Sequence, residues 1–240
     1  MQQAPLNSND YVQWRSPRRF DGLLHAVFDG RCRFCTARSA PLAICPGCHE
    51  DLPWISAGCQ QCGLPLASGA LQCAACLSRP PPFQHGMALW HYAHGIDRLI
   101  KRFKLNEDYA AGRLLTQIAA CGLRTRRWSC PAPLIPMPLH LARFTERGFN
   151  QSALIAKGLG TPVDSTLVRR IEHTPPQRGL EAAARRHNLS QAFALTRTPP
   201  AALTLVDDVI TTGASLTALA ECLRANGTRT IHVIALARAA

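Results

Sequence analysis

The segment from Leu203 to Ser215 constrains the fold of this chain more than any other stretch. It reads Leu-Thr-Leu-Val-Asp-Asp-Val-Ile-Thr-Thr-Gly-Ala-Ser, so an apolar run is followed by two carboxylates and then by a turn of small residues. An apolar run of this length is typical of a buried strand. Apolar residues from Leu216 to Leu223 then recur at helical spacing, which predicts a helix over about 214–226 that ends before Gly227.

The turn after this strand combines a phosphate-binding pattern with an acid pair. Backbone N–H groups, hydroxyls and the positive end of the helix dipole suit a phosphate, and the residues that supply them are Thr211, Thr212, Gly213, Ala214 and Ser215. Asp207 and Asp208 cannot bind the same phosphate, but they suit two adjacent hydroxyls, such as those of a ribose. An ordinary strand–turn–helix with a solvated Asp-Asp end is the alternative, but it does not account for both features together. The segment therefore predicts a site for a phosphorylated ribose.

This arrangement resembles the phosphoribosyl-pyrophosphate (PRPP) signature of type I phosphoribosyltransferases. It differs from a Walker loop, because no Gly-Lys-Ser/Thr follows the turn. The resemblance implies that residues 211–215 hold the 5′-phosphate of PRPP and that Asp207 and Asp208 hold its ribose hydroxyls.

Eight of the eleven cysteines form four Cys-x-x-Cys pairs, namely Cys32/Cys35, Cys45/Cys48, Cys59/Cys62 and Cys73/Cys76. A spacer of two residues lets both sulfurs face one ion, and two such pairs complete a four-thiolate zinc site. The pattern predicts two structural zinc ions, because a redox dithiol or a disulfide framework would not need four pairs in series. Sequential pairing and an interleaved arrangement both fit the spacing. His49 is expected at the surface, because the cysteines already fill all coordination positions.

Length and composition suit one globular core with a small satellite module. A proline run at 80–82 separates a metal module at 30–80 from a domain at 84–240, and residues 1–29 form a polar extension. We find no apolar window of about 18 residues and no apolar signal core, so we expect a cytoplasmic protein with no membrane span. The net charge is +12, mostly from arginine, which favours nucleic acid or a polyphosphate as a partner; an arginine-rich coding bias is the alternative.

Strand and helix patterns alternate over residues 84–240. We expect strands at 87–92, 134–138, 166–171, 203–206 and 230–237, and helices near 96–104 and 108–123. This alternation predicts an α/β fold in which helices flank a parallel sheet, with 203–206 beside 230–237. The ligand of such a sheet lies at the carboxyl ends of the strands. The helix from Ile96 is basic on its polar face, which either follows a phosphate backbone or simply faces solvent.

A Gly-containing loop after the strand at 134–138 also carries polar groups. Its candidate residues are His140, Arg143, Arg147, Phe149 and Asn150. Two arginines and a histidine beside a strand end suit a pyrophosphate or a nucleic-acid backbone. Phe149 is either a stacking platform for a base or a core anchor at the start of the next helix.

Several separated motifs occur in an order that resembles the ComF family. They are the Cys-x-x-Cys pairs, Pro-Met-Pro-Leu-His, Arg-Phe-Thr-Glu-Arg-Gly-Phe-Asn-Gln, Thr-Pro-Pro-Gln-Arg, Arg-Arg-His-Asn-Leu and Val-Asp-Asp-Val-Ile-Thr-Thr-Gly-Ala-Ser. The resemblance covers residues 30–240. It implies a type I phosphoribosyltransferase fold, a PRPP-type ligand with Mg²⁺, a double zinc ribbon at the N-terminus, and handling of incoming single-stranded DNA in the cytoplasm during natural transformation.

The segment from Thr174 to Phe193 also resembles the lid of glutamine amidophosphoribosyltransferases. It is polar and basic, and its candidate lid residues are Gln177, Arg178, Arg186 and Asn188; a plain surface loop is the alternative. Those enzymes rely on an N-terminal cysteine nucleophile, whereas position 2 here is Gln2. We therefore do not expect glutamine-dependent amide transfer.

Three functions are open from the sequence, ranked in this order. The first is a DNA-uptake protein that binds PRPP or a related phosphoribosyl nucleotide together with single-stranded DNA, with other DNA-uptake proteins as further partners. The second is a catalytically active phosphoribosyltransferase of unknown acceptor, in which pyrophosphate leaves from C1′ of PRPP. The third is a zinc-ribbon adaptor or sensor with a vestigial phosphate site.

Overall fold

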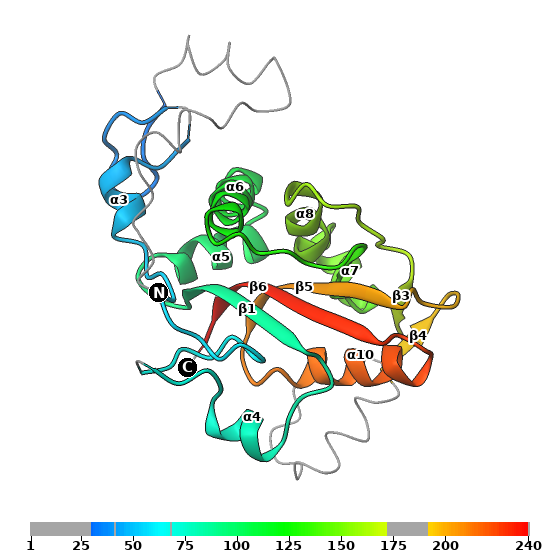
Figure 1. Cartoon of the computed structure of the whole chain (residues 1–240). Helices are drawn as coiled ribbons and strands as arrows, with labels where there is room; N and C mark the ends of the chain where they lie inside the picture. The colour runs from blue at the N-terminus through cyan, green and yellow to red at the C-terminus, as the bar shows by residue number, and fades with distance from the viewer. Residues whose placement is uncertain (1–29, 41, 68, 172–191, 240) are drawn as a thin grey trace, which may run out of the picture.

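A four-stranded parallel sheet forms the centre of the molecule. The computed structural model describes residues 30–40, 42–67, 69–171 and 192–239. The strand order is β1 (His85–His91), β6 (Thr230–Arg238), β5 (Ala202–Ile210) and β2 (Leu134–Pro136), and each neighbouring pair runs parallel (Figure 1). The predicted α/β fold is therefore confirmed, including the pairing of the strand before the acid pair with the last strand.

Helices cover both faces of this sheet. Helices α5 (Ile96–Leu105), α6 (Tyr109–Thr125), α7 (Leu141–Arg147) and α8 (Gln151–Gly158) lie on one side, and α10 (Ala214–Ala225) lies on the other (Figure 1). In the described part of the chain, no helix is both long and apolar enough to cross a membrane.

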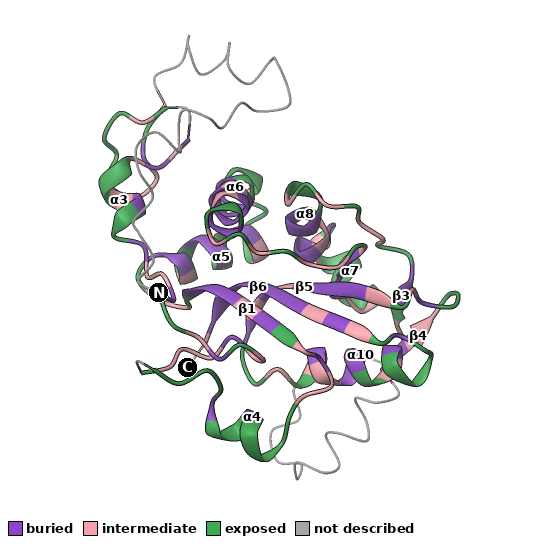
Figure 2. Cartoon of the chain, in the orientation of Figure 1, coloured by how far each residue is buried: buried purple, intermediate pink, exposed green. Residues whose placement is uncertain are grey.

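Each face of the sheet has its own apolar core, because successive side chains of a strand point to opposite faces. Val206 of β5 and Ile234 of β6 pack with residues of α5, α6 and α8. Leu205 and Val233, their neighbours in sequence, pack with α10 on the opposite face. Figure 2 shows most of each central strand as buried, with intermediate positions in between. A parallel sheet covered on both faces is expected to have such near-continuous apolar strands.

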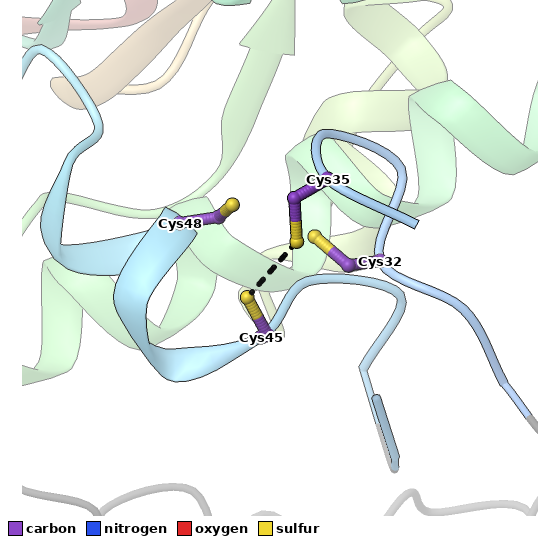
Figure 3. A group of neighbouring side chains, drawn as sticks. All are labelled: Cys32, Cys35, Cys45 and Cys48. Carbon is purple, nitrogen blue, oxygen red and sulfur yellow. Dashed lines mark hydrogen bonds between the residues drawn. The ribbon is translucent and has the colours of Figure 1, made fainter. Parts of the chain in front are cut away.

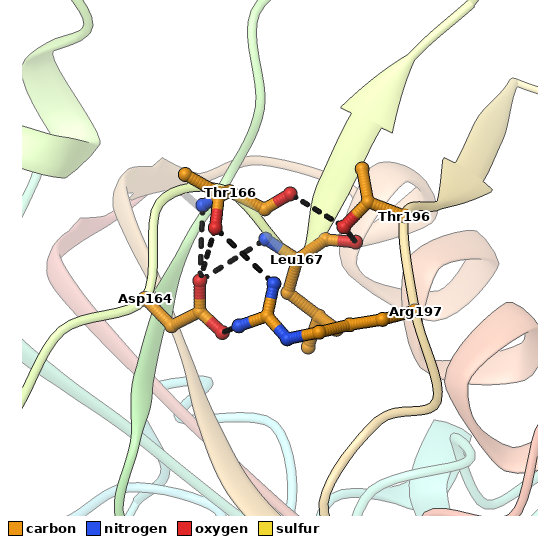
Figure 4. A network of polar contacts seen from close by, with 5 residues as sticks. All are labelled: Asp164, Thr166, Leu167, Thr196 and Arg197. Carbon is orange, nitrogen blue, oxygen red and sulfur yellow. Dashed lines mark hydrogen bonds and ion pairs between the residues drawn. The ribbon is translucent and has the colours of Figure 1, made fainter.

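The predicted strand at 166–171 does not join this sheet. Its shorter core, β3 (Val168–Arg170), pairs antiparallel with β4 (Phe193–Leu195) in a separate two-stranded sheet. A polar network closes the base of this hairpin (Figure 4). Asp164 Oδ1 accepts from the N–H groups of Thr166 and Leu167 at 3.0 and 3.1 Å, and Arg197 pairs with the other oxygen of Asp164. The residues just before β3 and just after β4 are therefore held together at the open end of the hairpin.

Two short helices belong to the cysteine-rich module, α3 (Pro46–Glu50) and α4 (Ala74–Ser78). The chain between them runs antiparallel along the free edge of β1. The N–H of Ile55 donates to the carbonyl of Leu89 and the N–H of His91 donates to the carbonyl of Pro53, both at 2.9 Å. The rings of Trp54 and Trp90 lie 5.2 Å apart at this edge. The module thus covers a strand edge that would otherwise expose unpaired backbone groups.

The first cysteine pair is also joined to the helical layer. Arg33 forms an ion pair with Asp108 at 2.8 Å, and Asp108 caps α6 by accepting from the N–H of Ala111 at 2.9 Å. Phe34 lies against Gly95, where a Cβ would come within 3.0 Å of the ring. Gly95 has a φ of 91°, so both its backbone conformation and this close approach require glycine. The division of the chain at 80–84 stays a prediction, and the N-terminal extension at 1–29 lies outside the described residues.

We predict that Trp54→Ala lowers the free energy of unfolding by about 2–3 kcal/mol, less than the loss for a fully buried tryptophan. The physical reason is the loss of packing against Trp90 and of the cation–π contact from Arg126, 5.6 Å from the ring of Trp54. Urea unfolding with zinc present measures the change. Leu77→Ala, at an exposed position of α4, is the control. A midpoint equal to that of the control would contradict the role of this edge contact.

Candidate functional site

Two clusters of four cysteines lie in the N-terminal module. Cys32, Cys35, Cys45 and Cys48 form one cluster (Figure 3), and Cys59, Cys62, Cys73 and Cys76 form the other. In each cluster all four sulfurs lie within 4.8 Å of one another. The structure therefore selects sequential pairing and excludes the interleaved arrangement.

The second pair of each cluster opens a short helix. Cys45 is the N-cap of α3 and Cys73 is the N-cap of α4, so the next cysteine of each pair lies one turn further along the helix. Backbone N–H groups point at sulfurs of the first pairs, from Phe34 to Cys32 Sγ and from Cys73 to Cys59 Sγ, both at 3.4 Å. Burial raises the pKa of Cys32, but the N–H groups around its sulfur outweigh this effect and lower that pKa to about 6. Such donors favour the thiolate that binds metal.

The sulfur geometry fits zinc. A tetrahedral ion with Zn–S bonds of about 2.3 Å requires sulfurs about 3.8 Å apart. The distance from Cys35 Sγ to Cys45 Sγ is 3.6 Å, and the distance from Cys62 Sγ to Cys73 Sγ is 3.7 Å. All-thiolate sites with four ligands are structural, because no position is left for a substrate. The two clusters are thus consistent with two structural zinc ions, which would supply folding energy to a module with little core of its own.

His49 is not the surface residue that the sequence led us to expect. Its side chain is 3% exposed and its ring centroid lies 5.2 Å from that of Trp54. Burial lowers the pKa of His49 to about 4, so this ring is neutral at physiological pH. The expectation was wrong because it considered only the coordination positions and not the packing of α3 against Trp54.

The acid pair lies inside β5 rather than after it, because that strand continues to Ile210. Asp207 Oδ1 accepts from Ser152 Oγ of α8 at 3.1 Å and from the N–H of Asp208 at 2.9 Å. Asp208 is 3% exposed, and its carboxylate pairs with Lys104 of α5. The two acids are therefore held by different helices.

The two carboxylates have an unusual electrostatic environment. Burial, together with the negative charge of Asp208, raises the pKa of Asp207 to about 8. Lys104 partly offsets this effect. The site therefore holds one carboxyl group that gains or loses a proton near neutral pH.

The predicted phosphate turn, residues 211–215, follows the end of β5 directly. Thr211 and Thr212 are exposed, and Gly213 adopts a φ of 78° as the N-cap of α10. Gly213 has no side chain to cap the helix, and in this turn Thr212 Oγ1 accepts from the N–H of Ala214 at 3.3 Å. The first turn of a helix of 12 residues thus points its N–H groups and its positive dipole end toward the exposed threonines.

The segment after β2 forms helix α7 instead of the expected loop. His140 caps this helix, since its Nδ1 accepts from the N–H of Ala142 at 3.2 Å. Arg147 donates to Gln151 Oε1 at 2.9 Å. Asn150 caps α8 and donates to the carbonyl of Met137 at 3.0 Å, which ties the helix start to the end of β2. His140 caps the start of α7 and Gly148 caps its end, which explains why the seven residues between them are helical.

Phe149 is a core anchor and not an exposed stacking residue. It is 7% exposed, and its ring lies 5.2 Å from that of Phe103 and 5.1 Å from that of Tyr109. Of the two interpretations left open by the sequence, the structure therefore selects core packing. The cause is that α5 and α6 bring two aromatic side chains to the start of α8.

Arg170 of β3 is a site residue that the sequence reasoning missed. Its backbone forms a bridge with that of His140. Burial and the positive charge of Arg143 lower the pKa of Arg170, while Asp207 opposes the shift. Two guanidinium groups are thus held near each other and near the acid pair, which is an arrangement that an anion would stabilise.

Lys104 and Ser152 were also missed as partners of the acid pair. Lys104 belongs to the basic face of the helix that begins at Ile96, and that face was the available signal. No local pattern marked Ser152. The candidate lid residues Gln177, Arg178, Arg186 and Asn188 lie outside the described residues.

Comparisons with known proteins add a family context. A family model for the double zinc ribbon domain matches residues 23–77. The chain is 34% identical to Competence protein F of Haemophilus influenzae over 226 residues, which cover 88% of this chain and 98% of that protein. It is 34% identical to DNA utilization protein YhgH of Salmonella typhimurium over 224 residues, covering 87% of this chain and 97% of that protein. The identity to YhgH of Escherichia coli K12 is 33% over 223 residues, with coverage of 87% and 97%.

We predict that the purified chain binds two zinc ions and that Cys35→Ala and Cys62→Ala each leave one, because each substitution removes a ligand of a separate cluster. The two variants should differ in stability. Leu42 and Ile44 of the first ribbon belong to the same apolar core as Ile100, whereas the second ribbon packs mainly within itself. Metal content by mass spectrometry and urea unfolding measure both effects. Loss of both ions from either variant, or a larger destabilisation in Cys62→Ala, would contradict this structure.

We also predict a pH dependence from Asp207. Its pKa is raised on folding, so between about pH 4 and pH 8 the folded state binds more protons than the unfolded state, and the free energy of unfolding falls as pH rises. Asp207→Asn mimics the protonated carboxyl and removes this contribution. The variant should therefore become more stable relative to the wild type between pH 5 and pH 8. Glu146→Gln, on the exposed surface of α7, is the control. Parallel stability curves for wild type and Asp207→Asn would refute the assignment.

Proposed function

The chain belongs to the ComF family, which includes Competence protein F and the DNA utilization proteins YhgH, and we propose that it binds a phosphoribosyl ligand together with single-stranded DNA during DNA uptake or use. The competence and DNA-utilization parts of this proposal come from the names of the relatives. The ligand and the manner of binding come from the residues at the carboxyl end of the parallel sheet.

One observation carries the phosphoribosyl part. An acid pair and an N-terminus of α10 without a side-chain cap from Gly213 follow each other directly at the end of β5. An anionic phosphate suits the helix end, and ribose hydroxyls suit the carboxylates. We assign the 5′-phosphate to residues 211–215 and the hydroxyls to Asp207 and Asp208.

A second anionic group would complete the ligand. His140, Arg143 and Arg147 stay our candidates for it, and Arg170 joins them, because the charge of Arg143 acts on Arg170 close to Asp207. A pyrophosphate bears enough negative charge to offset two guanidinium groups. PRPP contains all three groups that these residues would bind, namely a 5′-phosphate, ribose hydroxyls and a pyrophosphate.

The protein residues do not by themselves suggest a site for Mg²⁺. The carboxylate of Asp208 already pairs with Lys104, and the described residues bring no third acidic group to the pair. Any Mg²⁺ would therefore enter bound to the pyrophosphate of PRPP.

Single-stranded DNA is the second partner in the proposal. The net charge of +12 favours a polyanion, and α7 exposes Arg143 next to the phosphoribosyl site. The zinc ribbons would add a rigid surface to the same molecule. Proteins of the DNA-uptake apparatus stay candidate partners on the basis of the relatives' names alone.

Turnover of PRPP is a second candidate function, favoured by the raised pKa of Asp207. A carboxyl that exchanges a proton near neutral pH could assist an acceptor as pyrophosphate leaves C1′. The arginines would stabilise the negative charge that develops on the leaving group. The acceptor is not identified by any feature of the described residues.

We predict that, above pH 8 where Asp207 is also ionised, PRPP binds the wild type and Asp207→Asn/Asp208→Asn weakens this binding at least about tenfold, because amides lose the charge-assisted hydrogen bonds to ribose hydroxyls. Calorimetric titration with and without Mg²⁺ measures it. Asp164→Asn, in the network at the base of the β3–β4 hairpin, is the matched control. Release of pyrophosphate with a panel of acceptors separates turnover from simple binding. If PRPP fails to bind the wild type, the phosphoribosyl part of the proposal is wrong.

A further inference from the structure

Helix α7 is unusual because it buries none of its residues. It spans Leu141–Arg147 directly after the end of β2, and no side chain of the helix is buried (Figures 1 and 2). Leu141 is 72% exposed and Phe144 is 46% exposed. An exposed helix with two large apolar side chains has a reason other than core packing.

The apolar and basic residues of α7 form one continuous face. With about 100° between successive residues of a helix, Arg143, Arg147, Phe144 and Leu141 follow one another around an arc of about 160°. Thr145, Ala142 and Glu146 occupy the rest of the helix. The exposed aromatic ring therefore has Arg147 as its neighbour on this arc, where Arg147 also donates to Gln151, and Arg143 lies beyond Arg147, about 100° from Phe144. We call these four residues the α7 face.

Phe144 differs from the other exposed aromatic side chain in the described ranges. Tyr109 packs against the ring of Phe149 at 5.1 Å, so it belongs to the aromatic cluster of the core. Phe144 belongs to a helix in which no residue is buried, and its own side chain is exposed. Its ring is therefore available to a partner.

The charge beside this ring restricts the kind of partner. Arg170, whose backbone bridges that of His140 directly before α7, feels the charge of Arg143, so a third guanidinium adjoins the α7 face near the carboxyl ends of the strands. A second copy of this chain, docked through the same face, would bring these arginines against their own counterparts at a net charge of +12 per chain. A strand of nucleic acid instead supplies phosphates for the arginines and bases for the ring.

We infer that the α7 face is a binding surface for single-stranded nucleic acid, in which Phe144 stacks on a base while Arg143 and Arg147 contact the adjacent phosphates. This inference rests on the proposed function and names the surface that carries its DNA-binding part. Phe144 takes the stacking role that the sequence had left open for Phe149. Because Arg143 is also a candidate for the pyrophosphate of PRPP, this side chain lies where the proposed DNA surface meets the proposed phosphoribosyl site.

The test compares two labelled oligonucleotides of equal length, one of thymidines and one abasic, by fluorescence anisotropy. Phe144→Leu keeps the apolar bulk but removes the ring, so it should weaken thymidine binding about fivefold or more and leave abasic binding unchanged. Phe144→Trp should restore the thymidine affinity. Arg143→Ala should weaken binding of both strands equally and reduce the dependence on salt. Leu77→Ala, at another exposed apolar position, is the control.

Three results would overturn the inference. Equal affinities of wild type and Phe144→Leu for the thymidine strand would show that the ring does not stack. An equal loss on both strands would show a structural role for Phe144. A dimer that Phe144→Leu converts to a monomer in analytical ultracentrifugation would show that a second copy covers the face. The three results above would overturn only the role of the α7 face. If the wild type binds neither strand, the DNA-binding part of the proposed function fails as well, so the two kinds of failure can be told apart.

Discussion

The parallel pairing of β5 with β6 and β2 is the constraint on which the rest of this structure depends. Because the strands run in one direction, their carboxyl ends meet at the same edge of the sheet. The acid pair, the start of α10 and the start of α7 all follow strand ends at that edge. Residues separated by more than 60 positions in the chain thus reach one place without any long irregular loop in the described part of the domain.

The cysteine-rich module is more than a satellite. Its backbone pairs with β1, Arg33 joins the capping acid of α6, and Cys32 belongs to the main apolar core. Zinc would therefore stabilise both a ribbon with little core and the exposed edge of the sheet. The second ribbon makes fewer such links, since its buried residues pack mainly on one another. Metal at the two sites should accordingly have unequal structural consequences.

The candidate site balances opposite charges that are held by different elements. Lys104 from α5 neutralises Asp208, Ser152 from α8 donates to Asp207, and Arg170 from β3 lies close enough to be affected by Arg143. Neither the two acids nor the two arginines are stable neighbours on their own. The proposed phosphoribosyl ligand would offer hydroxyls to the acids and phosphates to the arginines.

The sequence by itself indicated the four strands of the central sheet, the acid pair, the small-residue turn after it and the eight clustered cysteines, because each depends on residues close together in the chain. Only the tertiary structure decided which cysteine pairs share an ion, since both arrangements have the same spacing. It also decided that Phe149 and His49 are buried, because burial depends on Phe103, Tyr109 and Trp54 from other segments. Lys104 and Arg170 entered the site for the same reason: parallel strand pairing brought distant charges to one edge, and no local pattern records such a meeting.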